Sequence, residues 1–498
     1  MSEWAELDRA LGAMAADGST EVREDGEWLA ELAGLRCELR EQGKNALVHL
    51  WSDERNLTRR VLRVRERSQD RIVLEVQRFG RTRPSCLEFL RKNSPRPAGR
   101  AGRERFRARL RRILAERFPD ATIDLLTAAP DLEHSFSGVY VRGRMRETSH
   151  AWAVLAIAPG ENAAAIEGAL AFGILWLDWE RGHSPRLATK GLRLFVPEGA
   201  SKLLRGRTLA LTPEARVEIF ELSESDGRIQ QVDAADAGNL ESWLIPRREI
   251  ESARAAAREA IARIHALARH LAPAGNEITT RLVPGTNEVA LCFRGLEFGC
   301  WSTGGIKFGL DDLQENLTGE NERALDRLMR RLDAHRSPFA EDTNHLLYRA
   351  APERWLETLV LQDPTRLDAQ LDGTHFYSQV PAVSAGDRGV IDLMGITRRG
   401  RLVIIELKAS EDIQLPMQAI DYWLRVRRHQ REGDFERYGY FADVQLDPKP
   451  PLLWLVAPAL RFHPSTDTLL KYLSPEIQIT RIGLSENWRS GLRVVFRQ

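Results

Sequence analysis

The sequence predicts a multidomain α/β protein. Its 498 residues are more than one hydrophobic core usually organises, so several domains are expected. Residues 1–90 alternate apolar and polar positions in short runs, which is the pattern of strands in an antiparallel sheet. Beyond them, strand-like runs alternate with longer runs of helical period. We place four domains at 1–90, 91–250, 251–345 and 346–498.

The overall composition excludes several classes of protein. The 72 basic and 71 acidic side chains leave a net charge of +1, which excludes a uniformly basic coat for nucleic acid but allows a local basic face. Four cysteines without a CxxC pair argue against a disulfide scaffold and a zinc site. The first residues lack a secretory signal, and the most apolar stretch is too short to cross a bilayer. We therefore expect a cytoplasmic protein with no membrane partner.

Residues 1–90 are expected to form a small β-rich domain. A short helix is predicted over 26–33, before strands over 35–39, 45–52, 59–67 and 70–79. A linker rich in Pro, Gly and Arg follows over 92–104 and runs into a helix over 105–118. From residue 91 to residue 118 there are eleven basic and two acidic side chains. This segment is either a solvated arginine helix or a surface that follows DNA phosphates, and the sequence favours neither.

The middle of the chain reads as an α/β domain followed by a connecting domain. Strands are predicted over 137–145, 151–159 and 191–198, with a helix over 163–181 and a hairpin over 215–233 that turns at Asp226-Gly227. Over 251–345 we expect a helix from 248 to 270, strand-like runs, and an amphipathic helix over 319–336. The chain contains no GxxxxGK[ST] motif, so no nucleotide cofactor is predicted.

The C-terminal domain has the clearest order of elements. It reads as a helix (352–362), a strand (375–383), a hairpin of two strands (389–397 and 402–410), a helix (415–430) and a strand (452–460). The helix returns the chain so that the last, fully apolar strand can lie parallel to the strand 402–410. The middle domain repeats this order. An internal duplication with one inactive copy is a hypothesis, and chance similarity between α/β domains is the alternative.

Two carboxylates and a lysine are expected to meet in the predicted hairpin. Glu406 and Lys408 stand two apart in one strand, so both project from the same face. The partner strand can place Asp392 beside them. Converging carboxylates repel each other, and a hard divalent cation such as Mg²⁺ is the usual compensation. The alternative, a turn cap and a structural ion pair, fits poorly because burying charges in the apolar run VIIELK is costly without a partner or a metal.

The residues IDLMGITRRGRLVIIELK, 391–408, resemble the Asp then Glu-x-Lys hairpin of the PD-(D/E)XK nuclease superfamily. Gln418 and Tyr422 match the QxxxY motif of its RecB-like and NucS-like branch, and four residues apart on a helix they share a face. The resemblance covers about 352–460. It implies an αβββαβ core, and an acid on the first helix for which Glu353 is the candidate and Glu357 the alternate. The middle domain would be a degenerate copy, because Ala156-Ile157-Ala158-Pro159 stands where the metal site should be.

The resemblance also implies an activity. Asp392, Glu406 and the carbonyl of Leu407 would bind Mg²⁺ or Mn²⁺, Lys408 would position the attacking water, Glu353 would support the metal or its water, and Gln418 and Tyr422 would face the site and the DNA. All four cysteines precede residue 301, so no iron–sulfur cluster is expected.

We expect a metal-dependent endodeoxyribonuclease acting on double-stranded DNA in repair, restriction or anti-phage defence. A second copy of the chain or a regulatory protein is a further candidate partner. The alternatives are a non-catalytic DNA-binding or assembly factor with a nuclease-like fold, and an effector nuclease activated by a ligand or a partner.

Overall fold

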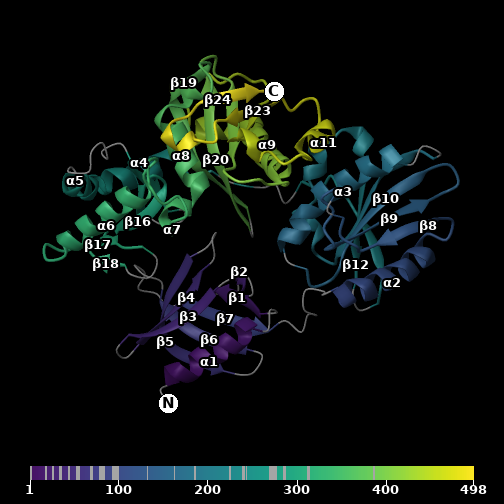
Figure 1. Cartoon of the computed structure of the whole chain (residues 1–498), viewed down its shortest axis with the longest axis horizontal. Helices are drawn as coiled ribbons and strands as arrows, with labels where there is room; N and C mark the ends of the chain where they lie inside the picture. The colour runs from purple at the N-terminus through teal and green to yellow at the C-terminus, as the bar shows by residue number, and fades with distance from the viewer. Residues whose placement is uncertain are drawn as a thin grey trace.

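The chain is a mixed α/β protein with several sheets, as predicted (Figure 1). The computed structural model describes residues 3–16, 20–24, 27–32, 36–42, 45–51, 56–67, 71–77, 85–91, 100–131, 133–161, 163–183, 187–223, 226–237, 242, 244–268, 277–283, 288–310, 314–384 and 387–498. Within them, four sheets form, and each is built from strands that are consecutive in the sequence. None of the described helices combines the length and apolarity needed to cross a membrane.

The N-terminal unit, residues 3–91, is a helix packed on an antiparallel sheet. Its elements are α1 (Glu3–Ala16), β1 (Thr20–Glu24), β2 (Glu27–Glu31), β3 (Arg36–Gln42), β4 (Asn45–Trp51), β5 (Asn56–Arg67), β6 (Arg71–Gln77) and β7 (Ser85–Arg91), in the sheet order β2-β1-β7-β6-β5-β4-β3. The helix predicted over 26–33 is wrong. That segment forms β2 because it pairs with β1 in a hairpin. The helix lies instead at 3–16, where Leu7, Leu11 and Met14 recur at helical spacing and pack into the core.

The middle unit, residues 100–237, has a six-stranded sheet with helices on both faces. Its elements are α2 (Arg100–Arg117), β8 (Thr122–Thr127), β9 (Tyr140–Arg146), β10 (Ala151–Ile157), α3 (Ala163–His183), β11 (Thr189–Pro197), η2 (Ser201–Leu203), η3 (Arg207–Ala210), η4 (Pro213–Ala215), β12 (Val217–Leu222) and β13 (Ile229–Val232). The strands lie in sequence order; β10, β11 and β12 are parallel, and the other pairs are antiparallel. The predicted hairpin at Asp226-Gly227 is present, whereas β8 was not predicted. Of the predicted linker, residues 92–99 lie outside the described residues.

The connecting unit, residues 247–349, is an antiparallel sheet flanked by helices. It comprises α4 (Arg247–Ala256), α5 (Arg258–Leu267), β14 (Ile278–Leu282), β15 (Val289–Phe293), β16 (Leu296–Ser302), β17 (Gly305–Phe308), β18 (Glu315–Asn316), α6 (Glu322–His335) and α7 (Leu346–Arg349). The single helix predicted over 248–270 is divided at Ala257, and its last two residues lie outside the described part of the chain. The amphipathic helix α6 buries Leu325, Met329 and Leu332, as its pattern predicts.

The C-terminal unit, residues 352–498, follows the predicted order of elements. It comprises α8 (Pro352–Gln362), β19 (Leu371–Ser384), β20 (Asp387–Thr397), β21 (Leu402–Leu407), α9 (Leu415–Glu432), α10 (Asp434–Arg437), β22 (Leu452–Pro458), α11 (Thr466–Lys471), β23 (Ile479–Leu484) and β24 (Val494–Arg497). The strands again lie in sequence order, and β22 is parallel to β21, as predicted. Strand β21 is buried throughout because α9 covers one face of the sheet and α8 the other.

Candidate active site

Two neighbouring strands bring Asp392 and Glu406 together. Leu393 on β20 pairs with Ile405 on β21, so the next step along the hairpin sets Asp392 opposite Glu406. Side chains alternate between the two faces of a sheet. Ile404 packs in the core below α9, so Glu406 and Asp392 project from that same face. The backbone N–H of Leu407 donates a hydrogen bond of 3.2 Å to Oδ2 of Asp392, which ties the two strands together at this point.

Glu406 is a buried carboxyl group with one unsatisfied oxygen. Its exposed fraction is 3%, and no atom of the described residues hydrogen-bonds to its Oε2. Burial and the nearby Asp392 raise the pKa of Glu406 well above its usual range. Burial likewise raises the pKa of Asp392 against the opposing effect of Arg354. A cation at this point would satisfy the oxygen and relieve the repulsion, so the donor set fits a hard divalent ion.

Lys408 lies directly after β21 and faces acidic groups. Its Nζ is 3.2 Å from Oδ2 of Asp412 and 3.9 Å from Oε1 of Glu406. Burial alone would lower the pKa of Lys408, but Glu406 and Asp412 outweigh it and raise the pKa, so the ammonium group stays charged. Sequence analysis did not identify Asp412. The only feature of the sequence that could have identified Asp412 is its position four residues after Lys408.

Glu353 and Glu357 both lie on the side of α8 that faces these strands. Oε1 of Glu353 accepts a hydrogen bond of 3.2 Å from the backbone N–H of Ala409, and its charge raises the pKa of Asp392. Glu357 is buried and lies 2.8 Å from Arg354. Burial raises the pKa of Glu357 to about 7 although Arg354 opposes the shift. Glu353 is therefore the acid that contacts the end of β21, while Glu357 is held by its own helix.

Arg354 is a residue of the site that sequence analysis missed. Its charge lowers the pKa of Asp392, Glu357 and Glu406, so it lies within electrostatic reach of all three acids. Its position next to Glu353 gave no separate signal in the sequence, because an arginine in the first turn of a helix is common on a solvated surface.

A buried arginine of the connecting unit holds the start of α8. The guanidinium group of Arg336 is fully buried and donates hydrogen bonds to the carbonyl oxygens of Leu347, Ala350 and Ala351, at 2.8, 2.6 and 3.2 Å. The two units also approach closely at Gly295, where a Cβ atom would come within 2.3 Å of the Arg354 carbonyl. The position of Glu353 therefore depends on a neighbouring unit.

Gln418 and Tyr422 lie on α9, which covers the face from which Asp392 and Glu406 project. Both side chains are half-buried, and Tyr422 packs against the core shared by α9 and the sheet. The helix that carries the two residues of the predicted motif therefore lies over the same face of the sheet as Asp392 and Glu406.

A second group of metal-ligand side chains lies at the other end of α9. His429, Glu432 and Asp434 can bring one ligand atom each within 4.8 Å of one another. Both ring nitrogens of His429 already have hydrogen-bond partners, because Nδ1 lies 2.7 Å from Asp434 Oδ2 and Nε2 lies 2.9 Å from the hydroxyl of Ser242. This group links α9 to the chain that leaves the middle unit.

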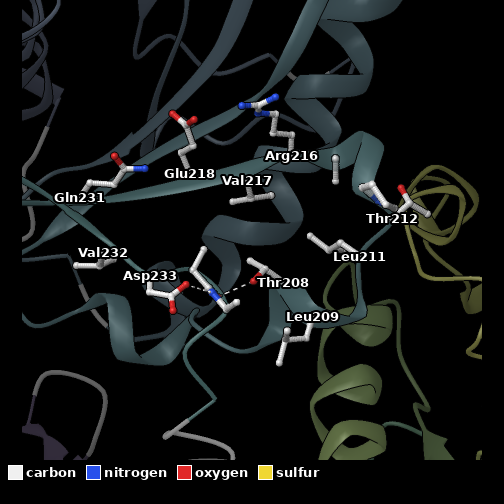
Figure 2. A pocket seen from close by; sticks show the side chains of 14 residues that line it. Thr208, Leu209, Leu211, Thr212, Arg216, Val217, Glu218, Gln231, Val232 and Asp233 are labelled. Carbon is white, nitrogen blue, oxygen red and sulfur yellow. Dashed lines mark hydrogen bonds between the residues drawn. The ribbon is translucent and has the colours of Figure 1, made fainter.

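The described residues also contain a pocket of about 550 Å³ in the middle unit (Figure 2). It lies beside η3, η4, β12 and β13, and Thr208 on its rim donates a hydrogen bond of 2.6 Å to the carbonyl of Ala234. None of the candidate site residues lines it. The pocket and the acidic site are therefore separate features of the molecule.

Comparison with protein-family models and with curated proteins finds no match to this sequence. The chemistry of the site is therefore argued from its own groups. Asp392 and Glu406 supply oxygen ligands for a hard cation, and Lys408 supplies a fixed positive charge beside them. That combination suits reactions in which a water attacks a phosphate centre and negative charge increases.

Proposed function

We propose that the C-terminal unit is a metal-dependent nuclease of the PD-(D/E)XK type that hydrolyses phosphodiester bonds within DNA. The observation that carries the proposal is the buried Glu406 beside Asp392 and Lys408, whose Oε2 has no hydrogen-bond partner within the described part of the chain. The element order α8, β19, β20, β21, α9, β22 supports it, because it corresponds to the αβββαβ core expected from the sequence.

Each residue of the site has a role in this proposal. Asp392 and Glu406, with the carbonyl of Leu407, would hold Mg²⁺ or Mn²⁺. When bound, the ion makes a coordinated water more acidic and stabilises negative charge on the phosphate. Lys408, fixed between Glu406 and Asp412, orients the water and adds a positive charge next to the scissile group.

The remaining residues keep the site in shape and connect it to the substrate. Glu353 accepts from Ala409 N–H and so holds the chain that carries Lys408, and it also supports the metal or its water. Gln418 and Tyr422 on α9 would face the site and the DNA.

An effector nuclease controlled by a ligand or partner is a second candidate. The observation that favours it is the contact of Arg336 with the start of α8, because a movement of the connecting unit would displace Glu353. Under this alternative, the purified chain cuts weakly until the activating molecule is added.

The test is cleavage of supercoiled plasmid with Mg²⁺, Mn²⁺ or EDTA by the wild type and by the Lys408→Ala and Asp392→Ala variants. We expect metal-dependent cleavage that falls by about 10²-fold or more in both variants, since each removes a group needed in the transition state. The exposed Lys449→Ala is the matched control and should cut at the wild-type rate. DNA binding, measured by mobility shift, should persist in Lys408→Ala. Cleavage by that variant at the wild-type rate would contradict the assignment.

A further inference from the structure

The middle unit and the C-terminal unit share one topology. In each, six strands lie in sequence order, the third, fourth and fifth strands are parallel, and the other pairs are antiparallel. A helix precedes the first strand in both (α2 and α8), and a long helix joins the third strand to the fourth (α3 and α9). The element order that the duplication hypothesis requires is therefore present in both units.

Two glycines establish which residues correspond. Gly143 lies between Leu126 and Val154 in the middle sheet, and Gly395 lies between Phe376 and Val403 in the C-terminal sheet. In both sheets a Cβ atom on the glycine would collide with the first strand. Each glycine and its two strand partners thus give a matched set of three residues. Three residues before the glycines, Tyr140 corresponds to Asp392. Three residues after Val154 and Val403, Ile157 corresponds to Glu406.

The middle unit has no carboxylates at these two places. Tyr140 and Ile157 are direct partners across β9 and β10, and both are buried. The Tyr140 hydroxyl donates a hydrogen bond of 2.7 Å to the carbonyl of Ala165 at the start of α3. Beyond the end of β10, Arg103 from α2 pairs with Glu161 at 2.9 Å, whereas in the C-terminal unit the acid Glu353 of α8 contacts the chain after β21. Among the described residues, this arrangement provides no oxygen cluster for a metal.

The two units meet through equivalent surfaces. One continuous core contains residues of α3 and of α9. The contacts are reciprocal, because α11 of the C-terminal unit packs against α3 (Figure 1) and η3 of the middle unit packs against α9. Both α11 and η3 belong to the connection between the fourth and fifth strands of their own sheet.

The polar contacts are reciprocal in the same way, because the long helix of each unit contacts the connection that follows the fourth strand of the other unit. Asp421 on α9 lies 3.3 Å from Arg207 of η3, and Asp178 on α3 accepts a hydrogen bond of 3.1 Å from Tyr472 after α11. Between them, Leu211 and Leu473 form an antiparallel bridge that joins the two connections. An interface in which the same patch is used from both sides is the arrangement of a two-fold symmetric dimer.

From this arrangement we infer that the middle unit takes the place of the second subunit of a nuclease dimer, so that one chain engages duplex DNA as a monomer and nicks one strand. The inference rests on the proposed function of the C-terminal site. The two strands of a duplex are related by two-fold symmetry, so a symmetric dimer sets one site at each strand. Here the equivalent surfaces are already buried within one chain, and only one of the two units carries the acids.

The experiment is a time course on supercoiled plasmid with Mg²⁺, with plasmid in excess over protein, together with light scattering of the full chain. We expect open circles to accumulate as the first product, at a rate proportional to protein concentration, and a molar mass near 56.4 kDa. Linear plasmid should form only after most circles carry several independent nicks. Lys408→Ala should give neither product and the same molar mass.

Two other results would count against the inference, and they differ. Linear plasmid that appears together with the first open circles, or a rate that rises with the square of protein concentration, would overturn it while leaving the nuclease intact. No metal-dependent cleavage by the wild type, with a monomeric mass, would overturn the proposed function and the nicking activity with it.

Discussion

At the scale of single residues, the site is defined by charges that the fold buries. Glu406 interrupts an otherwise apolar strand, and its burial raises its pKa because the charged form loses its water. Such a group is tolerated when a partner or a cation compensates for the lost hydration. Arg354 and Lys408 supply part of this compensation, while Oε2 of Glu406 has no hydrogen-bond partner among the residues that the structure describes.

Glu357 gives this burial a measurable pH dependence. Its pKa rises from the usual 4.5 to about 7 on folding, so its protonated form stabilises the fold below about pH 4.5 and that stabilisation is lost as the pH rises through about 7. Such a shift corresponds to ~3 kcal/mol. In EDTA, we therefore expect the difference in free energy of unfolding between Glu357→Gln and the wild type to shift in favour of the variant. The shift should reach up to ~3 kcal/mol between pH 5 and pH 8. Urea unfolding at both pH values measures this difference.

The control for this prediction is Glu315→Gln, because Glu315 is exposed. Its stability relative to the wild type should stay constant across the same pH range. A constant difference for Glu357→Gln as well would show that the carboxyl group of Glu357 is ionised at an ordinary pH in the folded chain.

At the scale of elements, α8 depends on a contact outside its own unit. Arg336 is fully buried. Burial, together with the nearby positive charges of Arg489 and Arg294, lowers the pKa of Arg336 to about 9. Its hydrogen bonds to Leu347, Ala350 and Ala351 fix the backbone at the start of the helix. The position of the first-helix acid therefore depends on a contact with the connecting unit.

Arg336→Met should reveal this dependence. The substitution leaves several buried carbonyl groups without a donor, and each unsatisfied group costs about 1–3 kcal/mol, so we expect a loss of several kcal/mol in the free energy of unfolding. Arg330→Met, on an exposed turn of the same helix, should change it by less than about 0.5 kcal/mol. Urea unfolding measures both. Equal midpoints for the two variants would contradict the role of Arg336.

At the scale of the whole molecule, the middle and C-terminal units form one structural body. A shared core, the Leu211–Leu473 bridge and two aspartate contacts join them. The two aspartates have different partners, because Asp421 pairs with the cations Arg207 and Arg425 while Asp178 accepts a hydrogen bond from the neutral Tyr472.

This difference in partners predicts a difference in stability. Asp421→Ala removes the carboxylate that pairs with the buried Arg425, and breaking a buried ion pair from one side costs about 3–5 kcal/mol. Asp178→Ala removes a hydrogen bond from a neutral hydroxyl and should cost about 1 kcal/mol. Urea unfolding of the two variants tests the order. A larger loss for Asp178→Ala would show that the pairing of charges does not dominate this interface.

The residues alone determined the C-terminal hairpin, the parallel partner strand and the set Asp392, Glu406 and Lys408. These features are local: strand alternation fixes which side chains share a face, and a charge inside an apolar run indicates a compensated site. The apolar spacing of α1 was equally local but was not recognised, and the segment 27–31 became a strand only because β1 pairs with it.

Only the tertiary structure decided which groups surround that set. Arg354 and Asp412 lie beside Glu406 because a helix and a loop fold back on the strand. Arg336 reaches α8 from another unit, and the reciprocal contacts of α3 and α9 join segments more than two hundred residues apart. Such contacts leave no periodic signal in the sequence, because they depend on how finished elements pack and not on the spacing of residues within one of them.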